Sequence, residues 1–125
     1  MTKEKFEVSP DSLMREMCEN DINRVGGKTA FAAMKKGDKA GAEVVETYLS
    51  YLACGVANLI NIFQPEVFTI GGGVSGEGDN LIVPLKAKVA KETYSKDNTL
   101  KSDLRIAKLG NDAGIIGAAY LYTLK

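Results

Sequence analysis

The chain has 125 residues, of which 45% are hydrophobic and 26% charged, and its 16 basic and 16 acidic side chains give a net charge of zero. This length fits one domain with a sizeable core, and the neutral balance excludes a global field that would attract nucleic acid or an anionic membrane. The sequence contains no histidine, which removes the commonest general base and the commonest metal ligand.

The cysteines and the N-terminus are typical of a cytoplasmic protein. Cys18 and Cys54 lie inside apolar helical patterns, and two cysteines are too few for a zinc site or for the disulfide framework of a small secreted domain. We therefore expect two buried thiols and no metal site. The charged N-terminus leads to no signal segment, and the most apolar stretch, Tyr51–Phe63, is shorter than the ~20 residues of a membrane span.

The first helices are predicted between Ser9 and Gly37. Ser9 can cap a helix whose first turn holds Pro10. Apolar residues then recur at helical spacing, namely Leu13, Met14, Met17 and Cys18. A short helix is predicted over 28–36, where Gly37 fits a C-terminal cap and Asp38 can cap the helix that follows.

The strongest pattern predicts one long helix between Asp38 and Gln64. Its apolar residues step by four and three positions, as Val45, Leu49, Leu52, Val56, Leu59 and Phe63. A second apolar stripe consists of Val44, Tyr48, Tyr51 and Ile62, so we expect burial on more than one side. Asn58 and Asn61 share one face and are expected to bond a neighbouring loop. Pro65 ends the helix, because the residue before a proline is biased away from helical conformation.

The rest of the chain alternates strands and helices. The predicted elements are a strand at 66–70, a glycine-rich loop at 71–78, a helix capped by Asp79 or Asn80, a polar connection at 95–102, a strand at 104–109 and a helix at 113–124. This order implies parallel strands and the α/β class. Because parallel sheets usually have more strands, we expect others near the N-terminus or outside this chain.

Two glycine motifs are compared with known phosphate loops. Gly27-Lys28-Thr29 resembles the end of a P-loop, but Ile22 stands where that motif needs glycine, so an inter-helix turn is the better interpretation. The loop at 71–78 satisfies GxGxxG after a strand, but a dinucleotide site also needs an acidic residue about 20 positions on, at the end of a second strand. The region at 91–96 is predicted to be helical and then polar, with no strand.

The loop at 71–78 nevertheless suits a ligand. Consecutive glycines allow the backbone to approach a ligand without a Cβ, and the start of the next helix offers unpaired N–H groups and a positive dipole end. We predict a nucleotide site at the carboxyl end of the strand at 67–70. A bare tight turn is the alternative.

Three blocks in order resemble the C-terminal half of the ROK family, which comprises repressors, open reading frames and sugar kinases. They are LACGVANLINIFQPEV at 52–67, IGGGVS at 70–75 and LGNDAGIIGAA at 109–119. The resemblance implies an actin-like (RNase H-like) ATPase fold of two domains, with ATP and Mg²⁺ in the cleft between them. It further implies that Gly71, Gly72, Gly73 and Val74 form the adenosine side of the nucleotide site.

The other signatures of the family have no counterpart in this sequence. The DxGxT phosphate loop, the segment with the catalytic aspartate and the CxCGxxGC zinc block are missing, so no catalytic residue and no metal ligand can be carried over. We therefore expect residues 1–125 to be a C-terminal fragment without the N-terminal domain. Its parts would be N-terminal helices at 1–37 and the long helix with the strand–helix unit at 38–125.

The resemblance leaves two functions open. The first is part of a glucokinase-like enzyme that transfers phosphate from ATP to a hexose held by the missing half, forms a homodimer and is inactive as this fragment. The second is the sugar-binding part of a ROK repressor, whose helix-turn-helix would lie upstream, so neither places nucleic acid in these residues. The motif at 110–114 looks more like the kinases. An oligomerising scaffold that stands alone is a third possibility.

Overall fold

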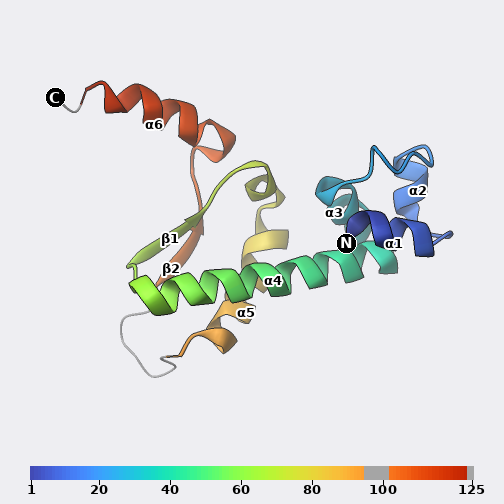
Figure 1. Cartoon of the computed structure of the whole chain (residues 1–125), viewed down its shortest axis with the longest axis horizontal. Coiled ribbons are helices and arrows are strands. Elements are labelled where there is room, and N and C mark those ends of the chain that lie inside the picture. The colour runs from blue at the N-terminus through green and yellow to red at the C-terminus, as the bar shows by residue number, and fades with distance from the viewer. Residues whose placement is uncertain (95–101, 124–125) are drawn as a thin grey trace. The chain divides into compact units, whose positions relative to one another are not determined.

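The computed structural model describes residues 1–94 and 102–123. The chain divides into two compact units, Met1–Leu52 and Ala53–Lys125, and the division falls inside the long helix α4, Lys39–Phe63 (Figure 1). None of the helices in these described ranges is both long and apolar enough to cross a bilayer. The boundary predicted at residue 37, between the N-terminal helices and the long helix, is a different division from this one and stays a prediction.

The first unit packs three short helices with the start of α4. They are α1 (Thr2–Val8), α2 (Leu13–Met17) and α3 (Gly27–Lys35). The buried apolar residues of this unit include Phe6, Met14, Ala30, Phe31, Val45 and Leu49. The guanidinium of Arg15 lies 4.7 Å from the centre of the Phe6 ring, and it also donates to the Phe6 carbonyl at 2.9 Å. One basic side chain thus ties α2 to α1.

The start of α2 differs from the prediction. Ser9 follows α1 and does not cap α2, because the cap is Ser12, whose Oγ accepts from the Met14 amide at 3.2 Å. The same hydroxyl donates to the Asp38 carboxylate at 3.1 Å, and the Leu13 amide donates to the other carboxylate oxygen at 2.7 Å. The cap residue Ser12 is therefore bonded to Asp38, 26 residues away, and spacing within the helix could not predict this contact.

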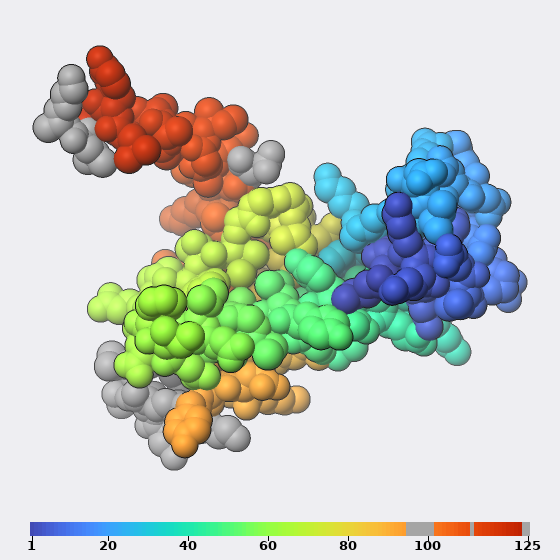
Figure 2. Space-filling view, in the orientation of Figure 1, coloured from blue at the N-terminus to red at the C-terminus, as the bar shows by residue number. Residues whose placement is uncertain are grey.

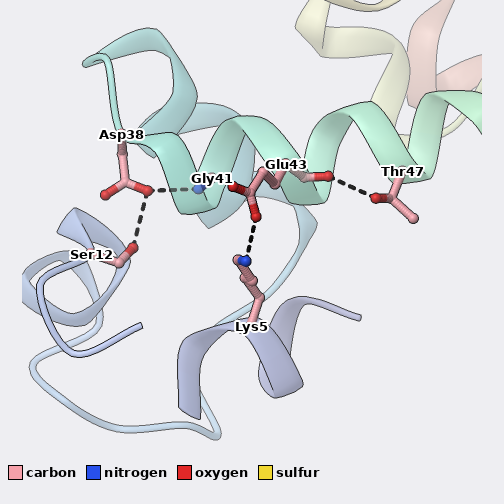
Figure 3. Close-up of polar contacts among 6 residues, drawn as sticks. All are labelled: Lys5, Ser12, Asp38, Gly41, Glu43 and Thr47. Carbon is pink, nitrogen blue, oxygen red and sulfur yellow. Dashed lines mark hydrogen bonds and ion pairs between the residues drawn. The ribbon is translucent and has the colours of Figure 1, made fainter. Parts of the chain in front are cut away.

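The junction of α3 with α4 follows the prediction. Gly37 adopts φ +86° after α3, and the Gly41 amide donates to Asp38 Oδ1 at 2.6 Å, which caps α4 (Figure 3). Gly41 itself lies against α3, since a Cβ there would be 2.9 Å from the Ala30 carbonyl oxygen. Figure 3 also shows Lys5 of α1 paired with Glu43 of α4.

The second unit contains the predicted strand–helix–strand–helix order. Its elements after α4 are β1 (Val67–Ile70), the 3-10 turn η1 (Gly73–Glu77), α5 (Asp79–Glu92), β2 (Asp103–Ile106), the 3-10 turn η2 (Gly110–Asp112) and α6 (Ala113–Leu121). β1 and β2 pair in parallel, from Val67 opposite Asp103 to Ile70 opposite Ile106 (Figure 1). The described residues form only this two-stranded sheet. Most of the polar connection predicted at 95–102 lies outside them.

The cap predicted for α5 is wrong. Asp79 is already the first helical residue, and the N-cap is Gly78, which adopts φ +58°. The Asn80 side chain donates to the Glu77 carbonyl at 3.4 Å and does not cap the helix. Glycine replaces a side-chain cap because its positive φ turns the chain from η1 directly into α5.

The end of α4 is less buried than predicted. Tyr51, Ile62 and Phe63 are 71%, 70% and 71% exposed. The prediction that the helix is buried on more than one side is therefore wrong for this part of α4. Cys54 is exposed as well, whereas Cys18 is buried as expected. The apolar pattern identifies a face, but whether the chain covers that face depends on tertiary packing. Asn61 accepts from the Tyr94 amide at 3.1 Å, which confirms the predicted loop contact for that residue.

Candidate functional site

The glycine loop lies where two parallel strands end together. Because Ile70 is opposite Ile106, the segments that follow β1 and β2 leave the sheet at the same edge, and η1 contacts η2. The Ala107 amide donates to the Ile70 carbonyl at 2.9 Å, which extends the ladder to the first residue after β2. Ligands of parallel α/β sheets bind outside this carboxyl edge.

Two glycines give the loop its shape. Gly72 adopts φ +76° with ψ −172°, and Gly78 adopts φ +58° with ψ −127°, so both lie in the positive-φ region that other residues rarely enter. Gly73 differs, because a Cβ there would have no neighbour within 4 Å, and at Gly71 it would meet Ala107 at an ordinary 3.7 Å. The fold of this chain therefore requires glycine at 72 and 78 but not at 71 and 73.

The loop presents unpaired backbone donors. The N–H groups of four successive residues donate no hydrogen bond to any described residue. They are the amides of Gly71, Gly72, Gly73 and Val74. The three glycines are exposed and Val74 is half-buried. Figure 2 shows the loop as yellow-green atoms at the surface. A run of such amides, three of them on glycines, fits an oxygen-rich anionic or sugar group of a nucleotide.

Ser75 fixes the turn behind these donors. Its hydroxyl donates to the Gly72 carbonyl at 2.7 Å, and its amide donates to the same oxygen at 3.1 Å. Its own carbonyl accepts from the Gly78 amide at 3.2 Å. Ser75 is not among the site residues predicted from the sequence. Its place two residues after three glycines is the signal that would have found it.

The charged cluster on the sheet does not belong to this site. Arg105 donates to Asp103 at 2.5 Å, and Lys86 approaches the same carboxylate at 3.9 Å. The hydrogen bond from Arg105 lowers the pKa of the Asp103 carboxyl. Asp103 is the first residue of β2, so the cluster lies toward the opposite edge of the sheet from the glycine loop.

The other two motifs have different roles. Thr29 accepts from the Gly26 amide at 3.2 Å and from the Cys18 thiol at 3.7 Å. Gly27-Lys28-Thr29 is therefore the first turn of α3, whose N-cap is Gly26, and the interpretation of these residues as an inter-helix turn is wrong. The block at 109–119 runs into α6, which buries none of its described residues. No group of three or more Cys, Asp or Glu side chains in residues 1–94 and 102–123 is arranged to hold a metal ion.

Comparison with known proteins places the whole pattern in one family. A model of the ROK family matches residues 8–125. A glucokinase from Halalkalibacterium halodurans is 41% identical over 95 residues, which cover 75% of this chain and 28% of that protein. A glucokinase from Streptomyces coelicolor is 30% identical over 121 residues, 95% of this chain and 38% of that protein. The chain thus spans between 28% and 38% of the length of these relatives.

A solved structure agrees with the sequence comparisons. The crystal structure of a ROK family glucokinase from Streptomyces griseus, in complex with glucose and AMPPNP, matches 96% of this chain with a TM-score of 0.83. The identity is 24%, and the match covers 39% of that protein. This likeness confirms the fold class expected from the sequence, an actin-like ATPase fold.

Proposed function

The chain belongs to the ROK family, and from that premise we propose that it forms the adenosine side of the nucleotide site of an ATP-dependent sugar kinase of the glucokinase type. The observation that carries this proposal is the run of four amides at 71–74 that donate to none of the described residues, at the carboxyl edge of a parallel strand pair. The names of the two relatives support a kinase over a repressor.

The proposed role of this chain is to hold and orient the nucleotide. ATP supplies the phosphoryl group, and its transfer depends chiefly on positioning and on charge stabilisation from both sides of a cleft. The amides of Gly71, Gly72, Gly73 and Val74 donate to oxygens on the nucleotide, and the missing side chains at 71–73 let it approach the backbone. We propose no magnesium ligand and no hexose ligand from this chain. The proposal assigns the binding of the hexose and the role of catalytic base to residues outside these 125.

The proposal predicts a residue-specific response to nucleotide. In a titration of the ¹⁵N-labelled chain with AMPPNP, followed by NMR, we expect the largest shifts at the amides of 71–74. Adenosine alone should shift the same amides, because the proposed contact is with the adenosine side. Shifts confined to other segments, or no shift at millimolar AMPPNP, would contradict the proposal.

A pair of glycine variants separates ligand contact from folding. Gly73→Ala should keep the free energy of unfolding, since a Cβ there has open space, but weaken AMPPNP binding at least several-fold because that space is proposed for the ligand. Gly55→Ala is the matched control, with equally open space on α4 away from the loop. Equal affinity of both variants would argue for the bare turn.

We also propose that the full protein acts as a homodimer. Large apolar side chains on the C-terminal part of α4 and on α6, among them Ile62, Phe63, Ile115 and Tyr120, are exposed in this chain. Exposed apolar surface of this kind is typical of interfaces. Light scattering at high concentration measures the mass of the protein directly. A monomeric mass would contradict both the proposed homodimer and the alternative of an oligomerising scaffold.

A further inference from the structure

We infer that Ser75 is a positioning residue that holds the glycine loop in its nucleotide-binding conformation before the nucleotide arrives. The inference rests on the proposed function, because it concerns the same loop. Ser75 is not proposed to touch the nucleotide. It acts through the backbone of Gly72, one of the two glycines with positive φ in the loop.

The hydrogen bonds of Ser75 close the loop from inside. The Gly72 carbonyl receives both the hydroxyl and the amide of Ser75, and the Gly78 amide donates to the Ser75 carbonyl. These bonds connect the two positive-φ glycines through one residue. Each peptide group that Ser75 holds fixes the direction of its neighbours, so the amides at 73 and 74 are set by the turn that Ser75 closes.

The side chain of Ser75, whose hydroxyl bonds the Gly72 carbonyl, is buried. Ser75 is only 6% exposed, and it is the only buried residue of η1. A Gly72 carbonyl that loses the hydroxyl keeps only the longer bond from the Ser75 amide, at 3.1 Å instead of 2.7 Å. Consecutive glycines otherwise have many accessible conformations. Without the hydroxyl, a smaller fraction of free molecules has the binding conformation, and the apparent affinity falls by that fraction.

The test compares three variants of the 125-residue chain in the AMPPNP titration. Ser75→Ala removes the hydroxyl, and Ser75→Cys replaces it with a weaker donor of similar size. Thr93→Val is the matched control, because the Thr93 hydroxyl donates to the Val89 carbonyl at 3.0 Å at the far end of α5. Amide hydrogen exchange of Ser75 and Gly78 is measured in the nucleotide-free chain as a second readout.

We expect Ser75→Ala to bind AMPPNP about three- to tenfold more weakly, the size of one hydrogen bond. Ser75→Cys should be intermediate and Thr93→Val unchanged. The Gly78 amide should exchange faster in Ser75→Ala, while the melting temperature falls no more than in Thr93→Val. If Ser75→Ala binds like the wild type, the inference is overturned and the proposed function stands. If the wild type itself shows no response at 71–74, the proposed function fails and takes the inference with it.

Discussion

Asp38 connects two helices of the first unit through its buried carboxylate. Burial by itself would raise the pKa of Asp38, but hydrogen bonds from the Gly41 and Leu13 amides, the Ser12 hydroxyl and the Ala40 amide outweigh it and lower the pKa below its ordinary value. One carboxylate therefore caps α4 and holds the start of α2. The sequence predicts that Asp38 caps α4. It does not predict the bonds of Asp38 with Ser12 and Leu13, because these residues lie at the start of a different helix.

The lowered pKa predicts a pH-dependent stability. A carboxyl whose folded pKa is depressed contributes stability above its unfolded pKa of about 3.9, and that contribution is lost as pH falls through the folded value. Urea unfolding between pH 3 and 7 should therefore show Asp38→Asn less stable than the wild type by about 1.5–3 kcal/mol at pH 7. The difference should shrink toward pH 3. Asp11→Asn, at an exposed turn, is the control, and an equal loss at pH 3 and pH 7 would refute the charge argument.

At the scale of elements, the contact of α3 with α4 depends on the size of one side chain. Figure 3 shows Gly41 in the first turn of α4, where a Cβ would lie 2.9 Å from the Ala30 carbonyl, the Ala33 Cβ and the Met34 amide. Two of these three atoms are backbone and cannot rotate away. The sequence predicted both helices within one or two residues, because periodicity and caps are local, but it did not predict that they touch at Gly41.

Gly41→Ala should therefore destabilise the protein although alanine is the better helix former. Overpacking against backbone costs about 1–3 kcal/mol, while alanine in place of glycine in a helix contributes up to about 1 kcal/mol in favour. A net loss of about 1–2 kcal/mol in urea unfolding is expected. Gly55→Ala in the same helix, where a Cβ meets nothing within 4 Å, should be neutral or stabilising. A stable Gly41→Ala would mean that the helices separate readily.

At the scale of the whole molecule, this chain spans 28% to 39% of the three glucokinases compared above. The proposed function assigns it one side of a nucleotide site, and phosphoryl transfer needs both sides of the cleft. We therefore expect no turnover by the 125-residue chain in an assay that couples glucose phosphorylation to NADP⁺ reduction. The Streptomyces coelicolor glucokinase serves as the positive control. Turnover by this chain alone would contradict the assigned role.

The sequence by itself determined the family, the order of the elements and the position of the glycine loop, because periodicity, turn residues and motif spacing are local properties of a chain. Only the tertiary structure decided that Ser12 and not Ser9 caps α2, that Tyr51, Phe63 and Cys54 are exposed, and that Ser75 closes the loop. The first two depend on which distant groups meet or fail to meet, whereas Ser75 closes a local turn that also requires positive φ at Gly72 and Gly78. A buried hydroxyl or an apolar face looks the same in the sequence whether or not its partner is present.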